Sequence, residues 1–582
     1  MASIVVPSLL LAACLIGLPV FGGDYLSWQV GLYLLYGIAA QGVALAWGRG
    51  GFLPLGNALF FGLAGYGTAM MLTATGGSLV PILLAIVVIA AILAAFAWML
   101  AAIIFHGRTD SGPFFSLITL ALVLIASQLA ETNPQITGGF NGMSGYPALA
   151  GLDPFGNLYY VIAALVFVIS VCLMLVERLP AGLVMRALVS QEPRLQTLGF
   201  ATNRVKAWIF AGSAFITALA GSLFAAHQGL VSPPATGFVL STEFIVWAAV
   251  GGRLHPLGAL FGAVAIGMLS AELRDTVVWW EVMIAFIFLL VVLLAPGGAA
   301  ELFMRGLRKL GFRAKVPTAP ETPAPPSRAE TTDGALSLEA VDLRAGAVHI
   351  LRDLSFTCDA TGTMCVIGPN GAGKTTMLKA ITGAMPVQGG AVRLGTRDIT
   401  NAPPHRALNL GIGRKFQIPT VFGGLTVREN LQLAALAGRA KWLDFLRPAA
   451  LGWQSPTLTR LLAMPGVTLA GQAEVDAGTL PQGHRQMLEL ALTVGAAPRI
   501  LLLDEPTAGM SPEETALMVR LIQSYQAETG AFVLVIEHDM SLVEALKARV
   551  LVVHQGHALA EGTLEDIRSN ADVTAVYAGG KK

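Results

Sequence analysis

Charged residues are scarce in this chain. Asp, Glu, Lys and Arg make up 13% of its 582 residues, about half the share that is usual in a soluble domain. Hydrophobic residues make up 54%, and the mean hydropathy is +0.67. The chain is therefore too apolar to fold as one soluble domain, and its length predicts two or three domains.

Cysteine and net charge exclude further classes. The four cysteines, at positions 14, 172, 358 and 365, form no C-x-x-C pair, so we expect small buried residues and neither a disulfide framework nor a zinc site. The net charge of +1 gives no electrostatic reason to expect a nucleic-acid partner.

Long uncharged runs fill the first 300 residues. Residues 1–23 carry no Lys or Arg ahead of their apolar run and predict a first membrane helix rather than a secretory signal. About eight to ten crossings are expected from the roughly 20 apolar residues that a span requires. The further spans are predicted at 28–47, 52–72, 80–105, 113–130, 158–176, 207–226, 238–250, 257–271 and 277–295. Segments 238–250 and 257–271 are short and flank Gly251-Gly252, which favours interrupted or re-entrant helices.

Basic residues predict the orientation and the domain boundary. Two basic clusters are expected on the cytoplasmic side: Arg178, Arg186, Arg194, Arg204 and Lys206, then Arg305, Arg308, Lys309, Arg313 and Lys315. Five prolines between 317 and 326 predict an extended, semi-rigid tether. We therefore expect a multidomain chain: an all-α polytopic membrane domain at 1–300, a Pro-rich cytoplasmic linker at 301–334 and an α/β domain at 335–582.

A phosphate loop opens the motifs of the α/β domain. The apolar strand 364–367 runs into G-x-x-x-x-G-K-T, and a helix follows from Thr376, which is the context the motif requires. Glycines let backbone N–H groups approach phosphates, Lys374 is expected to reach the outer phosphates, and the Thr375 hydroxyl is expected to bind Mg²⁺. The loop residues are Gly368, Pro369, Asn370, Gly371, Ala372, Gly373, Lys374 and Thr375.

Two later apolar strands end in polar residues. Strand 500–503 is followed by Asp504 and Glu505, which could hold Mg²⁺ and polarise an attacking water, or could merely cap the next helix. Strand 532–536 precedes His538. A lone histidine is more often structural, but at the carboxyl end of a parallel strand it points to where ligands bind.

The ordered set of these motifs resembles the ATPase domain of ABC transporters over about 245 residues. The resemblance implies ATP and Mg²⁺ as cofactors, with Lys374, Thr375 and Thr376 at the phosphates and Asp504 at the metal. It implies Glu505 as the catalytic base and His538 as the switch that contacts the terminal phosphate. It further implies Gln417 as a metal ligand and sensor between nucleotide and membrane domain, with Leu480 and Gly483 in the signature that faces a partner's nucleotide.

Two departures from that family stand out. The usual signature Leu-Ser-Gly-Gly-Gln is replaced by Leu480-Pro481-Gln482-Gly483-His484, so a hydroxyl and a backbone N–H are missing at Pro481. The helix expected at 487–494 still offers its N-terminus to an anion, while hydrolysis at this composite site is left open. No aromatic residue that could stack on adenine occurs in 336–351, where His349 is the sole ring.

The membrane half resembles a permease of the hydrophobic amino acid uptake group. Segments 55–66, 137–145, 185–188 and 198–199 carry this resemblance. The group imports branched-chain amino acids, or urea and short amides. Segments 414–417 and 508–515 of the ATPase half resemble its urea branch. Branched-chain amino acids are the first expectation and urea or short amides the alternative.

Partners and location follow from the same resemblance. One chain holds one phosphate loop, so it implies a second permease and ATPase half, identical or different, and a periplasmic solute-binding protein. The expected location is the bacterial inner membrane, with the ATPase domain in the cytoplasm. An ABC exporter would need long charged helix extensions, for which the interruptions in 1–300 are too short, and a tethered regulatory ATPase would not need so many crossings.

The membrane half contains small and polar residues among its apolar runs. Gly62, Gly65 and Gly67 are expected to allow close helix packing. Gln41, Asn57 and Glu243 are rarer in such surroundings, and Glu243 is a candidate for the substrate path. The basic segment 179–206 contains a short polar helix at 191–199, which the resemblance predicts to dock on the ATPase against 418–425, unless it is an ordinary cytoplasmic loop.

Overall fold

The computed structural model describes residues 2–106, 112–295, 297–309, 320–326 and 334–578. These residues form two compact units, one from Met1–Arg178 with Asn203–Pro317 and one from Leu179–Thr202 with Thr318–Lys582. The segment between two apolar helices of the first unit is thus part of the second.

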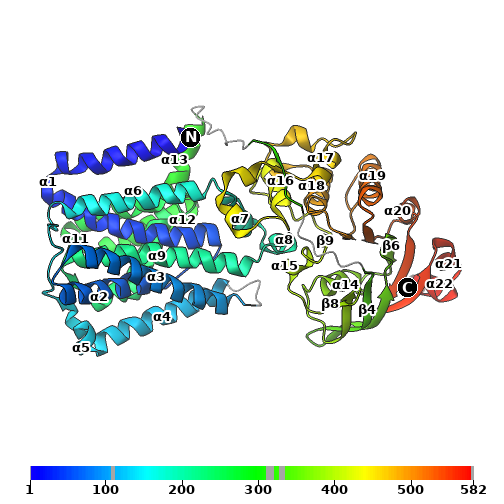
Figure 1. Cartoon of the computed structure of the whole chain (residues 1–582), viewed down its shortest axis with the longest axis horizontal. Coiled ribbons are helices and arrows are strands. Elements are labelled where there is room, and N and C mark those ends of the chain that lie inside the picture. Colours follow the sequence, from blue (N-terminus) through cyan, green and yellow to red (C-terminus); the bar gives the residue numbers. More distant parts are fainter. Residues whose placement is uncertain (1, 107–111, 296, 310–319, 327–333, 579–582) are drawn as a thin grey trace. The chain divides into compact units, whose positions relative to one another are not determined.

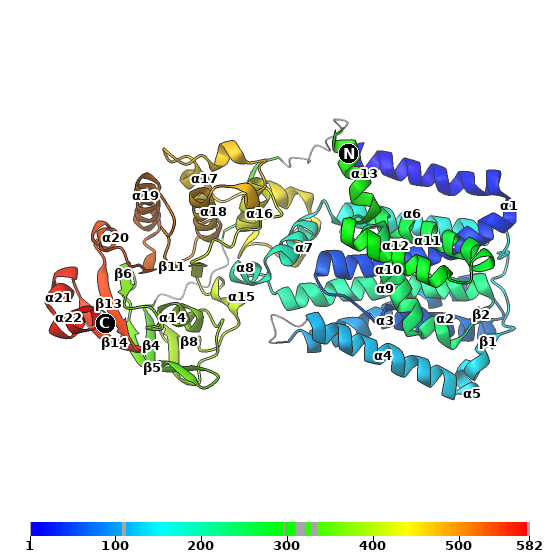
Figure 2. The same cartoon turned by 180° about the vertical axis from the view of Figure 1, so that it is seen from behind.

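The first unit is built of helices (Figures 1 and 2). Its two-residue strands β1 and β2 pair antiparallel. The elements are α1 Ala2–Ala44, α2 Asn57–Thr75, α3 Leu79–Ile104, α4 Gly112–Thr132, α5 Pro134–Thr137, β1 Met143–Ser144, α6 Leu158–Val176, α9 Thr202–Gln228, β2 Leu230–Val231, α10 Phe238–Gly251, α11 Pro256–Thr276, α12 Trp280–Leu294 and α13 Gly298–Lys309.

Seven helices among the described residues are long and apolar enough to cross a membrane. The two segments that the sequence predicts before residue 50 lie in α1 and in the π-helical turn Leu45–Arg49 that continues it. Gly23, with φ 73° and ψ 178°, separates them by a kink. The helix α10 has 14 residues, as its short apolar run predicts. The prediction of a second short helix at 257–271 is wrong, since α11 continues for 21 residues through polar Ser270 to Thr276.

Small residues allow close approach inside this unit. A Cβ added to Gly62 would lie 2.1 Å from Thr236 Cγ2 and 2.7 Å from its backbone nitrogen, and one added to Gly65 would lie 3.3 Å from the Gly221 carbonyl oxygen. At Gly67 the nearest atom would be Ile89 Cδ1 at 3.2 Å. The packing role predicted for these three glycines is confirmed.

The polar residues Asn57 and Gln41 join helices. The buried Asn57 donates from Nδ2 to Ser213 Oγ and Thr217 Oγ1, both at 3.1 Å. Gln41 donates to Ser170 Oγ at 2.9 Å and to the Pro256 carbonyl at 2.8 Å. These bonds pair the amide nitrogens and join helices that are far apart in the sequence, while Asn57 Oδ1 and Gln41 Oε1 accept no hydrogen bond from a described residue.

The second unit has helices packed on two sheets. Its described elements before residue 450 are α7 Pro180–Ser190, α8 Glu192–Thr197, β3 Thr322–Pro323, β4 Leu336–Ala345, β5 Val348–Thr357, β6 Gly362–Ile367, α14 Lys374–Ile381, β7 Gly389–Leu394, β8 Arg397–Asp398, α15 Pro404–Ala407, β9 Ile412–Lys415 and α16 Val427–Leu436. The remainder are β10 Trp453–Gln454, α17 Pro456–Leu462, α18 Gln482–Val494, β11 Ile500–Asp504, α19 Pro512–Thr529, β12 Phe532–Ile536, α20 Met540–Ala545, β13 Arg549–His554, β14 His557–Gly562, α21 Leu564–Ser569 and α22 Ala571–Ala578.

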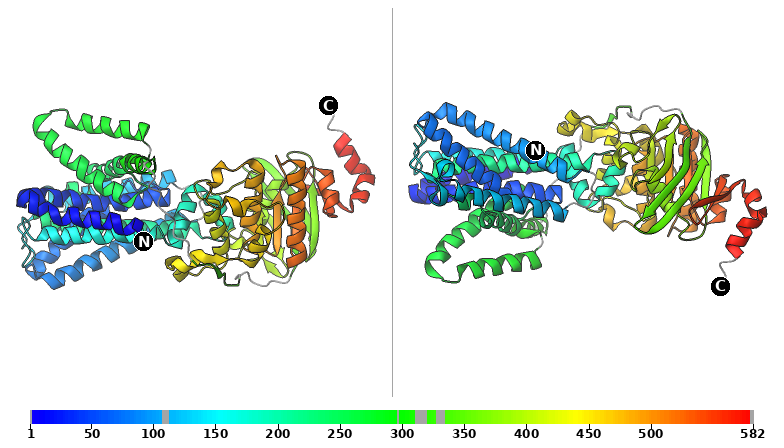
Figure 3. Two further views of the ribbon diagram at one scale, coloured as in Figure 1. Left: turned by 90° about the horizontal axis from the view of Figure 1, so that it is seen from above. Right: turned by 90° about the horizontal axis from the view of Figure 1, so that it is seen from below.

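The larger sheet has the order β14-β13-β6-β12-β11-β9, and all its strands are parallel except the edge strand β14. The smaller sheet, β5-β4-β7-β8, is antiparallel. Helix α18 packs beside α19 (Figure 3). Leu502, Leu534 and Met377 are fully buried in one core. The continuous apolar runs of β6, β11 and β12 fit this burial on both faces.

Part of the Pro-rich linker lies against this unit. Residues 310–319 and 327–333 of the predicted linker, with Arg313 and Lys315, lie outside the described residues. Between them, β3 pairs in parallel with β10, and the Ala324 N–H donates to the Gln454 carbonyl at 2.9 Å. The segment is extended, as its prolines predict, but it is held by backbone hydrogen bonds.

The cysteines divide between the units. All four are free; Cys358 and Cys365 are buried, whereas Cys14 and Cys172 are exposed on α1 and α6. The prediction of burial is thus wrong for Cys14 and Cys172, because helices that face lipid can present small apolar side chains outward.

Candidate nucleotide site

The phosphate loop joins β6 to α14. Gly368, Gly371 and Gly373 have φ values of 153°, 83° and 101°, which favour glycine. A Cβ at Gly368 would lie 2.1 Å from the Val553 carbonyl oxygen, while a Cβ at Gly371 would meet nothing within 4 Å. The loop is therefore closely packed at Gly368 and open at Gly371. The N-terminus of α14, which follows the loop, has backbone N–H groups without helical partners, and such groups bind phosphate.

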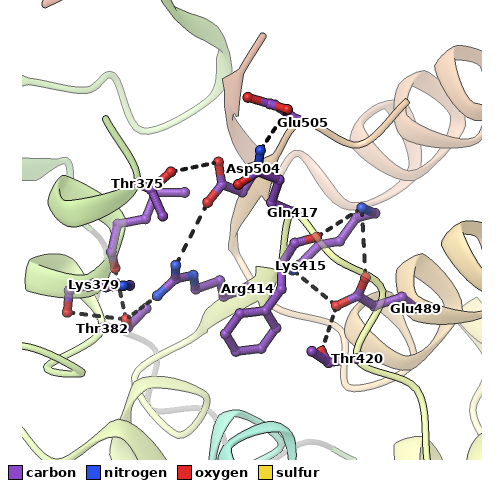
Figure 4. Close-up of polar contacts among 12 residues, drawn as sticks. Thr375, Lys379, Thr382, Arg414, Lys415, Gln417, Thr420, Glu489, Asp504 and Glu505 are labelled. Atoms are coloured by element: carbon purple, nitrogen blue, oxygen red, sulfur yellow. Dashed lines mark hydrogen bonds and ion pairs between the residues drawn. The ribbon is translucent and has the colours of Figure 1, made fainter. Parts of the chain in front are cut away.

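Two polar side chains at the start of α14 are placed by short contacts. The Lys374 ammonium donates to the carbonyls of Gly368 at 2.7 Å and Pro369 at 3.0 Å. Thr375 Oγ1 donates to Asp504 Oδ1 at 3.3 Å (Figure 4). Burial lowers the pKa of Lys374, although Glu505 and Asp504 oppose that shift. Thr375 thus meets Asp504, which ends the next strand but one, β11.

Asp504 is almost fully buried at 1% exposure. Burial raises its pKa, and the cation of Arg414 and the hydrogen bond from Thr375 oppose this shift. Its Oδ2 accepts no hydrogen bond from a described residue and lies 3.9 Å from Arg414 Nη2. A buried carboxylate oxygen beside a threonine hydroxyl suits Mg²⁺, which prefers oxygen ligands.

Glu505 lies between two other predicted site residues, Gln417 and His538. Its Oε2 accepts a hydrogen bond from Gln417 Nε2 at 2.9 Å, and its Oε1 lies 3.2 Å from His538 Nε2. Its φ of 44° is uncommon for a residue with a side chain and is often found at functional sites. The structure therefore brings Gln417, Glu505 and His538 together from three separate segments.

The signature residues are not bonded to the phosphate loop. None of the hydrogen bonds or ion pairs of the described residues joins Leu480 or Gly483 to that loop. Pro481 is the N-cap of α18, with φ −56° and ψ 157°. This helix starts at Gln482, five residues before the predicted start at 487, because proline suits the entry to a helix. Gly483 faces the Glu514 carboxylate, 2.0 Å from the position of an added Cβ.

His349 is engaged in the smaller sheet. Its Nε2 lies 2.9 Å from Asp342 Oδ1. Leu351, two residues later on β5, lies against the phosphate loop, 2.9 Å from where a Cβ on Gly373 would be. This end of β5 is therefore next to the loop, while the imidazole itself is held by the carboxylate.

The short helix α8 is anchored in the second unit by Arg194. The guanidinium donates to the Arg414 carbonyl at 2.6 Å, the Glu489 carbonyl at 3.1 Å and Thr493 Oγ1 at 2.8 Å. Arg194 is 1% exposed, and burial lowers its pKa. The predicted docking is thus found, but this anchor lies on β9 and α18 instead of at 418–425, and Ile418 is 76% exposed.

A second contact lies one helix earlier. Arg186 of α7 pairs with Glu429 of α16 at 2.7 Å. Further on, Gly199 lies near Leu408, and the rings of Phe200 and Phe445 are 6.1 Å apart. Docking therefore extends over most of the segment Leu179–Thr202.

Arg414, Lys415 and Glu489 were not predicted as site residues. Lys415 Nζ and Glu489 Oε2 are 3.7 Å apart and fully buried. Glu489 Oε1 accepts from the Phe416 N–H and Thr420 Oγ1, both at 3.0 Å (Figure 4). The sequence signal for this network is the pair of adjacent cations Arg414 and Lys415 in a short apolar strand. Buried charges need partners, so this pair indicates an acid nearby.

Comparisons with known proteins agree with this geometry. Residues 29–293 match the family described as branched-chain amino acid transport system / permease component, and residues 351–508 match the ABC transporter family. The high-affinity branched-chain amino acid transport ATP-binding protein BraF of Pseudomonas aeruginosa is 36% identical over 42% of this chain and 97% of its own length. The corresponding protein LivG of Escherichia coli is 34% identical over 42% and 97%.

A solved nucleotide-free ATP-binding cassette from an ABC transporter is 25% identical, with a TM-score of 0.37, over 42% of this chain and 98% of its own. The two family matches and the relatives fit the motifs in order. The chain binds and hydrolyses ATP in a domain that drives transport, and it belongs to the ABC transporters of the hydrophobic amino acid and urea uptake group, with the permease and the ATP-binding subunit fused in one polypeptide.

Proposed function

We propose that this chain is the permease-ATPase subunit of an importer for branched-chain or other hydrophobic amino acids. The observation that carries the importer mechanism is the burial of Arg194 within the second unit, because a segment from between two membrane helices is held there by three hydrogen bonds. The substrate class is supported by the permease match and by the relatives BraF and LivG.

The proposed chemistry uses the cluster around Glu505. Lys374 binds the outer phosphates, and Thr375 with Asp504 holds Mg²⁺, which neutralises phosphate charge when bound. No group of three or more His, Cys, Asp or Glu that could hold a metal occurs in the described part of the chain. Thr375 and Asp504 would hold Mg²⁺ together with non-protein oxygens, which the ion accepts as ligands. Glu505 accepts a proton from the attacking water, His538 contacts the terminal phosphate, and Gln417 holds Glu505 and senses the metal.

ATP closes a pair of such domains in this proposal. One chain supplies one phosphate loop, and the signature Leu480–His484 lies elsewhere on the domain, so the complete site uses the signature of a second half. Switching a gate from 1:99 to 99:1 takes about 5.5 kcal/mol of differential binding, which ATP supplies by preferring the closed pair. The partners are that second half and a periplasmic solute-binding protein, and the complex lies in the bacterial inner membrane with its ATPase domains in the cytoplasm.

Uptake measurements test the substrate. Cells that lack their own high-affinity amino acid uptake would express the chain with its partner subunits, and the uptake of radiolabelled leucine and urea would be measured. Saturable leucine uptake that the Glu505→Gln variant loses is the expected result, because that variant keeps the permease and removes the base. Urea uptake without leucine uptake would instead support the urea alternative, which the motifs at 414–417 and 508–515 favour.

A further inference from the structure

Arg414 lies between the docked segment and the acid at the candidate metal site. It belongs to β9, which pairs in parallel with β11, and Arg414 is opposite Leu502. Alternate residues of a strand point to the same face, so Arg414 shares a face with Asp504, two residues beyond Leu502. Arg414 is 3% exposed, and its surroundings leave little room for movement.

The side chain of Arg414 joins two parts of the nucleotide site. Its Nη2 lies 3.9 Å from Asp504 Oδ2, and its Nη1 donates to Thr382 Oγ1 at 3.3 Å (Figure 4). Thr382 is the C-cap of α14, the helix that begins with Lys374 of the phosphate loop. The Arg414 cation therefore faces the Asp504 oxygen that does not contact Thr375, at ion-pair distance.

The backbone of the same residue holds the docked segment. The Arg414 carbonyl accepts the 2.6 Å hydrogen bond from Arg194. Both guanidinium groups also lie near the Phe416 ring, at 5.8 Å for Arg194 and 4.9 Å for Arg414. A shift of Arg194 thus displaces β9 at Arg414 or leaves buried polar groups unpaired, which is costly.

We propose that Arg414 is a positioning residue that transmits the docking of Arg194 to the Mg²⁺ affinity of the nucleotide site. Its side chain forms an ion pair with Asp504 and its backbone carbonyl accepts from Arg194, so docking and metal binding share one residue. Coupling between two sites is reciprocal, so Mg²⁺-nucleotide also strengthens docking. The inference rests on the proposed role of Asp504 as the metal ligand.

The test measures how nucleotide binding depends on Mg²⁺. The full chain, purified in nanodiscs, binds a fluorescent non-hydrolysable ATP analogue while Mg²⁺ is titrated. Arg194→Ala and Arg414→Met are each expected to raise the half-saturating Mg²⁺ concentration about fivefold or more, while binding in EDTA is unchanged. The double variant is expected to equal Arg414→Met alone, since the effect of Arg194 passes through Arg414. Arg414→Lys, which keeps a cation, is expected to recover part of the loss.

Arg186→Ala is the matched control. It removes a docking contact of the same segment, to Glu429, that does not touch Arg414, so its Mg²⁺ dependence is expected to match the parent. Equal shifts for Arg186→Ala and Arg194→Ala, or additive shifts in the double variant, would overturn the proposal. Asp504→Asn tests the role of Asp504 separately from that of Arg414. If Asp504→Asn leaves the half-saturating Mg²⁺ concentration unchanged, both the metal role of Asp504 and the inference are wrong. If Asp504→Asn raises that concentration but Arg414→Met does not, only the inference is wrong.

Discussion

Gln417 Nε2 donates a hydrogen bond of 2.9 Å to Glu505 Oε2. The other carboxylate oxygen is 3.2 Å from His538 Nε2, so both oxygens are held by residues from different segments. Glu505 is therefore oriented by a residue that follows β9, the strand on which Arg194 is docked. This arrangement connects the proposed base to Gln417, three residues after Arg414, whose carbonyl accepts from Arg194.

Glu505→Gln is expected to keep ATP binding and to lower turnover about a hundredfold or more, because a general base contributes roughly 10²–10⁴-fold. The amide retains a carbonyl oxygen that can accept from Gln417. Nucleotide binding and phosphate release would be measured on the purified complex. Glu513→Gln, at an exposed acid near the start of α19, is the control and should resemble the parent. Undiminished turnover in Glu505→Gln would remove the base from the mechanism.

Gly62→Ala is expected to destabilise the membrane unit by about 1–3 kcal/mol, the usual cost of overpacking. The new Cβ would lie 2.1 Å from Thr236 Cγ2 and 2.7 Å from the Thr236 nitrogen, and the backbone contact cannot be relieved by a rotamer change. Thermal unfolding in detergent, followed by size-exclusion chromatography, gives the measurement.

Gly112→Ala is the matched control, because a Cβ on Gly112 at the start of α4 meets nothing within 4 Å. It should lie within about 0.5 kcal/mol of the parent. If the two variants unfold at the same temperature, the close approach at Gly62 does not contribute to stability.

The buried thiols of the ATPase domain are expected to resist alkylation at pH 8. Burial raises the pKa of Cys365 to about 12 and also raises that of Cys358, so only about one Cys365 side chain in ten thousand is a thiolate at that pH. A Cys14→Ser/Cys172→Ser variant removes the exposed thiols and would be treated with a maleimide. Mass spectrometry should find no adduct in the folded chain and two after denaturation. Rapid labelling of the folded chain would contradict the burial.

Regular elements with local signals could be predicted from the sequence. Helix α6 and strand β12 have the predicted bounds because an apolar run of suitable length defines each. The phosphate loop, Asp504, Glu505 and His538 were also predicted, since each follows a buried strand and parallel strands bring their carboxyl ends together.

Features that depend on distant contacts could not be predicted in the same way. The sequence shows Arg194 as one of several basic residues in a cytoplasmic segment, but its three acceptors belong to residues 414, 489 and 493. The sequence shows Arg414 only as part of a family motif, because its proximity to Asp504 depends on the strand order β11-β9. The early start of α18 was missed because helix periodicity is clear only from Met487 onward, while Pro481 marks the entry.

Pro481→Ser is expected to raise ATP turnover several-fold in the assembled complex. The residue is the N-cap of α18 and makes no side-chain cap bond. Serine is a preferred residue there and would add about 1 kcal/mol of helix stability relative to alanine. Its hydroxyl and backbone N–H would also restore two donors to the signature, which faces the phosphate of the second half in the proposed pair. Steady-state phosphate release is the readout, and Pro481→Ala, which restores the N–H without the hydroxyl, is the control. Equal turnover in the two variants would show that the missing hydroxyl does not limit hydrolysis. A higher rate in Pro481→Ser alone would mean that this half of the transporter contributes a weakened signature, so that the site completed by Leu480–His484 is the slower of two unequal ATP sites.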